Sequence, residues 1–165
     1  MRDYVWALLG IIFAFVLYSL FSKFTPGLNI LLNVFCVVVL YFAIRNGEMF
    51  GAGLGMCCGL LQDSFSLGVF GVAGIALTLL GYTAGLIAKR INVMSFSRRF
   101  LFCAILLAGE LLVWSFLYLT IFSERLFTGG GLLFLQPIFT ALVTSALFPL
   151  FHIVDGYWIQ RRAQG

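Results

Sequence analysis

Apolar and polar positions follow one another along this chain in long blocks. Short polar or Gly-rich breaks separate six apolar blocks, at residues 4–21, 28–44, 49–61, 67–88, 100–122 and 132–154. A bilayer core needs about 20 apolar residues per helix, with a range of roughly 17 to 25. Five blocks meet or approach that length, and the block at 49–61 is short and Gly-rich. The pattern predicts an all-α protein made of membrane-spanning helices.

The basic residues indicate how many blocks cross the membrane. Six crossings from a cytoplasmic N-terminus place eight of the ten Lys and Arg on one side, namely Arg2, Arg45, Lys89, Arg90, Arg98, Arg99, Arg161 and Arg162. Lys23 and Arg125 remain on the other side. An excess of basic residues marks the cytoplasmic side. Five crossings would move the basic loop 89–99 outside, so we expect a polytopic six-helix bundle with both termini cytoplasmic.

The composition leaves little chain for anything but this bundle. Of 165 residues, 62% are hydrophobic and 10% are charged, against about 25% charged in soluble domains. We therefore expect one integral membrane domain over residues 1–165, embedded in the lipid bilayer. The basic residues lie at helix ends and form no clustered stripe of the kind that nucleic-acid binding needs. Nucleic acid is not an expected partner.

Motifs for catalysis or metal binding are not evident. The four cysteines lie at predicted membrane depth without CxxC or Cys/His spacing, and we interpret them as small packing residues. The sequence shows no Ser/His/Asp arrangement and no nucleotide-binding glycine motif. We expect no enzyme activity, no cofactor and no metal.

Glycines recur at every fourth position near the middle of the chain. Gly51, Gly55 and Gly59 would form one stripe on the third helix, and Gly81 and Gly85 lie near one face of the fourth. Small residues let membrane helices approach closely, where packing replaces the hydrophobic effect as the source of association. Two interpretations stay open: an internal helix pair, or a groove that receives a partner's transmembrane helix.

Asp63 follows the glycine stripe by four residues, at the predicted external end of the third helix. A carboxylate there can cap the next helix, because it would lie near that helix's positive dipole end. The alternative is a recognition contact on the external face.

Glu110 is the most unusual residue for its position. It lies ten residues into the block 100–122, close to the bilayer midplane. A charge there costs about 2.5–3.5 kcal/mol, so we expect a protonated or hydrogen-bonded carboxyl group. Thr78, Tyr82 and Thr144 are at compatible depth as partners. Glu110 can join helices, contact a partner protein, or handle a ligand or proton.

The segment from Pro26 to Ile91 carries several short motifs that occur together. They are Asn29-Ile30-Leu31-Leu32, the Gly-rich run 51–66 that contains Leu60-Leu61-Gln62-Asp63, Gly68, Gly71, Tyr82 and Lys89-Arg90-Ile91, and they are followed by Gln136-Pro137, Thr140 and Pro149. With these residues the chain resembles the MreD family of bacterial rod shape-determining membrane proteins. Chain length and the number of spans agree. The Gly-rich run with its following Asp63 is the most specific part.

The resemblance implies a non-enzymatic component of the elongasome, which builds the lateral cell wall. Such a protein lies in the inner membrane with the bitopic protein MreC and works with the MreB cytoskeleton and the RodA–transpeptidase synthase. Its fold would be similar to the substrate-binding subunits of energy-coupling-factor vitamin transporters. The family supplies no catalytic residue to transfer, and Glu110 matches none of its motifs.

We therefore expect a membrane scaffold that binds a partner's transmembrane helix and helps determine rod shape. The alternative is a vitamin-binding transporter subunit on the same architecture, since one fold can carry several functions. Against it, the external loops offer few polar groups for a water-soluble ligand, mainly Asp63, Ser64 and Ser66. A proton-coupled carrier would need more than one acid at the midplane.

Overall fold

The computed structural model describes residues 2–24, 31–65, 70–90, 96–121 and 134–148. Within these residues the chain forms six helices and no strand: α1 (Arg2–Phe24), α3 (Val34–Asn46), α4 (Glu48–Phe65), α5 (Val72–Ala88), α6 (Phe96–Ile121) and an unlabelled last helix (Gln136–Phe148). A helix therefore lies in each of the six apolar blocks, and the all-α class is confirmed. The parts of the blocks at 28–30, 67–69, 122, 132–133 and 149–154 lie outside the described residues.

Polar residues set the helix ends where these depart from the apolar blocks. α3 begins at Val34 because Asn33 caps it: the Asn33 side chain accepts a hydrogen bond from the Cys36 amide, at 3.4 Å. α4 continues through Gln62 and Asp63 to Phe65, so it has 18 residues. α4 is therefore longer than the apolar block at 49–61, because these two polar side chains find partners on neighbouring elements and need no loop.

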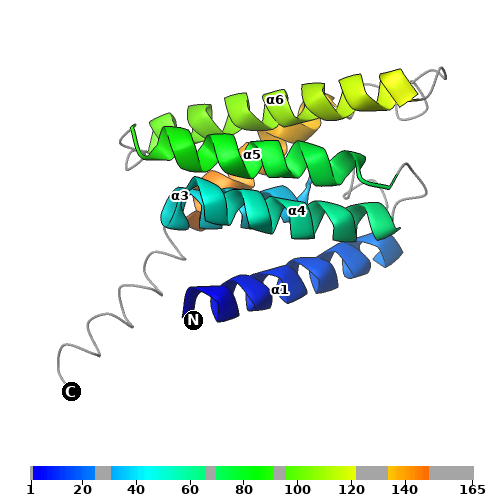
Figure 1. Ribbon diagram of the computed structural model, residues 1–165, viewed down its shortest axis with the longest axis horizontal. Helices are drawn as coiled ribbons and strands as arrows, with labels where there is room; N and C mark the ends of the chain where they lie inside the picture. The colour runs from blue at the N-terminus through cyan, green and yellow to red at the C-terminus, as the bar shows by residue number, and fades with distance from the viewer. Residues whose placement is uncertain (1, 25–30, 66–69, 91–95, 122–133, 149–165) are drawn as a thin grey trace.

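The helices run side by side, with α1 at one edge, α6 at the opposite edge and the others between them (Figure 1). α3 is the central helix: nine of its residues are buried, and it packs against α1, α4 and α5. The tight turn at Gly47 (φ 95°) joins α3 to α4. Only glycine adopts this backbone region readily.

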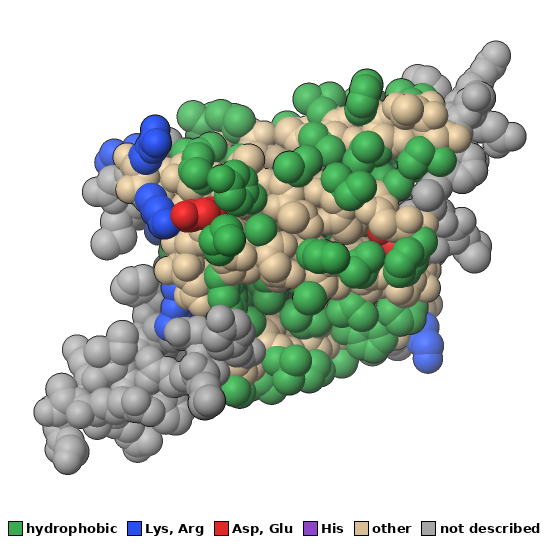
Figure 2. Space-filling view, viewed as in Figure 1, with side chains coloured by type: hydrophobic (Ala, Val, Ile, Leu, Met, Phe, Trp, Pro, Cys, Tyr) green, Lys and Arg blue, Asp and Glu red, His purple; other side chains and the backbone are tan. Residues whose placement is uncertain are grey.

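The outer surface carries apolar side chains on α1, α5 and α6 (Figure 2), and the last helix has exposed apolar residues as well. Examples are Phe13 of α1 and Phe116 of α6, which are 60% and 70% exposed. Among the described helices, Val5–Lys23 and Phe96–Ile121 are long and apolar enough to cross a membrane, and three others are shorter apolar helices. A surface of this kind suits a lipid environment. That each helix crosses the membrane stays a prediction.

Charged residues gather at the two ends of the bundle. Lys and Arg side chains lie mainly at one end, and a single cluster of basic atoms is visible at the other (Figure 2). Arg45 ends α3, and Arg98 and Arg99 lie in the first turn of α6, whereas Lys23 lies in the last turn of α1. α1 begins at the basic end (Figure 1). The distribution agrees with the expected positive-inside arrangement.

Candidate functional site

The glycine stripe of α4 lies against α5. Gly51, Gly55 and Gly59 are buried, and the backbone of α5 fills the space where their side chains would be. A Cβ atom on Gly59 would meet the Ala73 carbonyl oxygen and the Gly74 Cα at 2.5 Å, and one on Gly55 would overlap the Leu77 carbonyl. Neither contact leaves room for a side chain.

α5 contributes its own glycines to the same contact. A Cβ on Gly81 would overlap the Gly51 carbonyl, and one on Gly85 would overlap the backbone of Glu48. The two helices thus approach closely along their whole length, as small residues permit. Because α5 occupies this face of α4, a partner helix cannot bind to the stripe in this structure. The stripe acts in helix packing.

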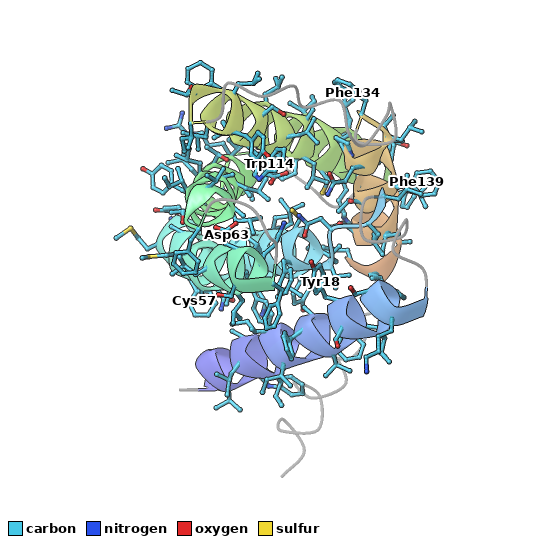
Figure 3. All side chains as sticks on the ribbon, turned by 90° about the vertical axis from the view of Figure 1, so that its right-hand side faces the viewer. Tyr18, Cys57, Asp63, Trp114, Phe134 and Phe139 are labelled. Atoms are coloured by element: carbon cyan, nitrogen blue, oxygen red, sulfur yellow. The ribbon has the colours of Figure 1, made fainter. Side chains whose placement is uncertain are left out.

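Asp63 joins the far end of α4 to the start of α5. Its Oδ2 accepts hydrogen bonds from the amides of Gly71 (2.8 Å) and Gly74 (3.2 Å), and its Oδ1 accepts one from Ala73 (3.3 Å). These amides have no partner within α5, since they belong to its N-terminal end. Figure 3 shows Asp63 at the junction of the two helices. The capping interpretation therefore agrees with the geometry, and the carboxylate is buried rather than presented to a partner.

A second polar junction at the same end links the start of α3 to α4 and to the last helix. Asn33, which precedes α3, donates its side-chain amide to Gln62 Oε1 of α4 at 3.3 Å. Its backbone amide donates to Thr140 Oγ1 of the last helix, also at 3.3 Å. Sequence reasoning missed this junction. An Asn directly before an apolar run was the available signal for the cap, but the contact with Thr140 spans 107 positions.

Glu110 faces this junction from α6. A small pocket, too narrow for a water-sized sphere, is lined by Glu110, Asn33, Gln136 and Thr140 together with Cys36, Leu107, Leu111 and Pro137. The partners expected from depth, Thr78, Tyr82 and Thr144, do not line this pocket. Tyr82 is 42% exposed, and Thr78 and Thr144 each donate to a carbonyl one turn earlier in their own helix. The half-buried position of Glu110 beside other polar groups favours a role in joining α6 to α3 and the last helix.

The basic end is held by an ion pair between α4 and α5. Lys89 Nζ lies 2.5 Å from Glu48 Oε2, and the hydrogen bond from Lys89 lowers the pKa of Glu48. The Arg99 guanidinium lies 4.3 Å from the centre of the Phe148 ring, a cation–π contact between α6 and the last helix.

The cysteines do not form a site. Cys36, Cys58 and Cys103 are buried, Cys57 is exposed on the outside of α4 (Figure 3), and all four are free thiols. In the described part of the chain, no three His, Cys, Asp or Glu side chains come together as metal ligands. Among the described residues, the hydrogen bonds that join separate helices gather at the Asp63 and Asn33 junctions.

The comparisons with known proteins bear on this bundle. Residues 1–154 match the family described as rod shape-determining protein MreD. Neither the curated proteins nor the solved structures gave a match, so the expected likeness to energy-coupling-factor transporter subunits stays a prediction. The family match covers nearly the whole chain, including the glycine stripe, Asp63 and Glu110. The chain belongs to the MreD family, and it is a membrane protein with a role in determining rod shape.

Proposed function

We propose that this protein is a non-enzymatic membrane scaffold of the cell-wall elongation machinery. It binds an MreC-like bitopic protein and, through that partner, acts with the MreB cytoskeleton and the RodA–transpeptidase synthase. The observation that carries the proposal is the family match over residues 1–154. The interior supports it, because polar groups of separate elements bond to one another at the Asp63 and Asn33 junctions, as a structural role requires.

The protein lies in the inner membrane as a multi-pass bundle with both termini cytoplasmic. Support comes from the concentration of Lys and Arg at one end of the helices, where α1 also begins (Figures 1 and 2). Reporter fusions after Gly165 and within residues 129–131 should report opposite sides of the membrane. The same side for both fusions would contradict six crossings.

In this proposal the residues of the glycine stripe serve the partner indirectly. Gly51, Gly55 and Gly59 hold α4 against α5, with Gly81 and Gly85 opposite them. Asp63 fixes the end of this pair, and Glu110 ties α6 to the rest. The partner's helix then packs on a surface that the assembled bundle presents.

Affinity purification from native membranes in mild detergent tests the function. We expect the tagged protein to recover a bitopic MreC-like protein in a fixed ratio, without a bound small molecule. Recovery of a bound vitamin and no bitopic protein would contradict the scaffold and support the transporter alternative. A strain that lacks the gene and regains rod shape with the tagged protein shows that the tag is harmless.

A further inference from the structure

An apolar groove of about 450 Å³ runs between α1, α3 and the last helix. Its lining residues are Trp6, Leu9, Gly10, Phe13, Leu17 and Phe21 of α1; Leu32, Val34, Val37, Val38, Tyr41, Phe42 and Arg45 from Leu32 to the end of α3; and Val143 and Leu147 of the last helix. Arg45 is the one charged side chain in this lining. None of the polar junctions described above reaches the groove.

The groove exists because α1 contacts its neighbours along one side. Tyr18 packs on Phe35 of α3, with ring centres 5.5 Å apart (Figure 3), and Phe15 packs on Phe65 of α4 at 5.0 Å. The small residues Ala7 and Ala14 are buried in this contact. The last helix lies on another side of α3, where Tyr41 meets Phe148 at 5.5 Å. Among the described residues, the space between α1 and the last helix is the groove.

The size and lining of the groove limit what it can hold. Small-molecule pockets measure roughly 300–1,000 Å³ and are mostly apolar, whereas a transmembrane helix is about 10–12 Å wide with its side chains. A space of 450 Å³ is therefore suited to a hydrocarbon chain and too small to enclose a helix. In a membrane protein the chain available at such a place is a lipid acyl chain.

Arg45 adds a headgroup preference at one end. It is exposed, its Nη1 donates to Tyr41 Oη at 3.2 Å, and both side chains line the groove. It lies in the last turn of α3, at the basic end of the bundle, and the six-crossing arrangement proposed above would bring this end to the phosphate groups of one leaflet. Guanidinium groups bind phosphate with well-defined geometry, and basic pockets between membrane helices attract anionic headgroups.

We propose that the groove binds one anionic phospholipid, with an acyl chain between α1 and the last helix and its phosphate on Arg45. The lipid comes from the leaflet at the basic end, which is the cytoplasmic leaflet in the orientation proposed above. It fills the gap beside α1 and makes the attachment of this helix dependent on lipid charge.

Trp6 lines the groove and reports on its occupant. A protein with Trp114→Phe and Trp158→Phe keeps Trp6 as its one fluorophore. It is reconstituted in phosphatidylcholine vesicles that contain a small fraction of brominated phosphatidylglycerol or, in parallel, brominated phosphatidylcholine. If the contact with the headgroup is charge-assisted, the brominated anionic lipid should quench Trp6 with an apparent affinity about tenfold higher than that of brominated phosphatidylcholine.

Four variants separate a specific site from general attraction. Arg45→Gln should abolish the preference and Arg45→Lys should keep most of it, whereas Lys23→Gln, which removes a charge from the other end of α1, should leave it unchanged. Val143→Phe should weaken quenching by both lipids because it fills the groove. Membrane abundance and melting temperature are measured for each variant, so that a folding defect is recognised.

Quenching of Trp6 in the protein with unchanged groove residues can by itself overturn the proposal. Equal quenching by the two brominated lipids would contradict it even if every variant misfolded. If Lys23→Gln and Arg45→Gln lost the preference for the anionic lipid equally, general surface charge and not the groove would explain that preference. Weak quenching by both lipids, with cross-linking from a cysteine at position 13 to another protein or a second copy, would assign the groove to a protein helix instead.

Discussion

The α4–α5 pair and the α1–α3 pair use small residues in different ways. Between α4 and α5, a Cβ at Gly55 would overlap the backbone carbonyl of Leu77, and a backbone cannot move aside without displacing the helix. Between α1 and α3, a Cβ at Gly10 would lie 3.1 Å from the ring of Phe42, which is a side chain. The α4–α5 contact is backbone to backbone along both helices. In the α1–α3 contact aromatic rings lie between the two backbones, and a groove remains beside them. The comparison teaches that α4–α5 is the rigid part of the bundle and α1 the adaptable part.

One substitution in each helix pair tests this comparison, and we expect the largest loss of stability here. Gly55→Ala should lower the stability in detergent by about 3 kcal/mol or more, because overpacking against backbone cannot relax. Gly10→Ala should stay within about 1 kcal/mol of wild type, since the ring can shift and alanine favours the helix. Thermal melting of both purified variants measures the difference. Similar losses would show that α1 is packed as rigidly as α5.

A positive charge at position 110 of α6, which belongs to neither helix pair, should destabilise the bundle almost as much as Gly55→Ala. Glu110→Lys brings an ammonium group to membrane depth, where a charge costs about 2.5–3.5 kcal/mol, whereas Glu110→Gln keeps hydrogen-bonding capacity without a charge. We expect Gln to be tolerated better than Lys in membrane abundance and in rod-shape complementation. Equal loss for both would mean that an ionised carboxylate is required and that joining helices is not the role of Glu110.

The Asp63 cap at the far end of the α4–α5 pair should contribute somewhat less to the stability of the bundle. Asp63→Ala removes the acceptor of three amide hydrogen bonds and should cost about 2 kcal/mol, while Asp63→Asn keeps one acceptor oxygen and should lose less. Ser64→Ala is a matched control, because Ser64 is exposed and bonds within α4. If Asp63→Ala melted like Ser64→Ala, the cap would not hold the pair together.

The ion pair at the basic end should have the smallest effect. Lys89 lowers the pKa of Glu48 in the folded protein, so the stabilisation is present above the ordinary Glu pKa and is lost as the pH falls through the lower, folded value. Lys89 is 60% exposed, and pairs of this kind contribute little. Melting curves of wild type and Glu48→Gln should therefore converge at acid pH and differ slightly at neutral pH. A constant difference at both pH values would contradict this linkage.

The rigid pair could be predicted from the sequence better than the adaptable part. Glycines at every fourth position of α4, with Gly81 and Gly85 on the next helix, predict a close helix contact, and local spacing left open whether the neighbour is internal or a partner's helix. Asp63, shortly before the next helix, is a capping signal. The Asn33–Thr140 contact, the surroundings of Glu110 and the groove beside α1 could not be predicted, because they depend on how distant helices are placed. Ala7, Gly10 and Ala14 carried a weak signal for the α1 contact, which the sequence analysis did not use.

The central claim is that the glycine stripe builds the bundle and that the assembled bundle holds the partner. The most direct test compares Gly55→Leu with Gly53→Leu, whose glycine is exposed and would meet nothing within 4 Å. Membrane abundance and recovery of the bitopic partner are quantified from the same membranes. Our account predicts that Gly55→Leu loses abundance and partner together, while Gly53→Leu keeps its abundance. Gly55→Leu at normal abundance, with or without its partner, would contradict the account.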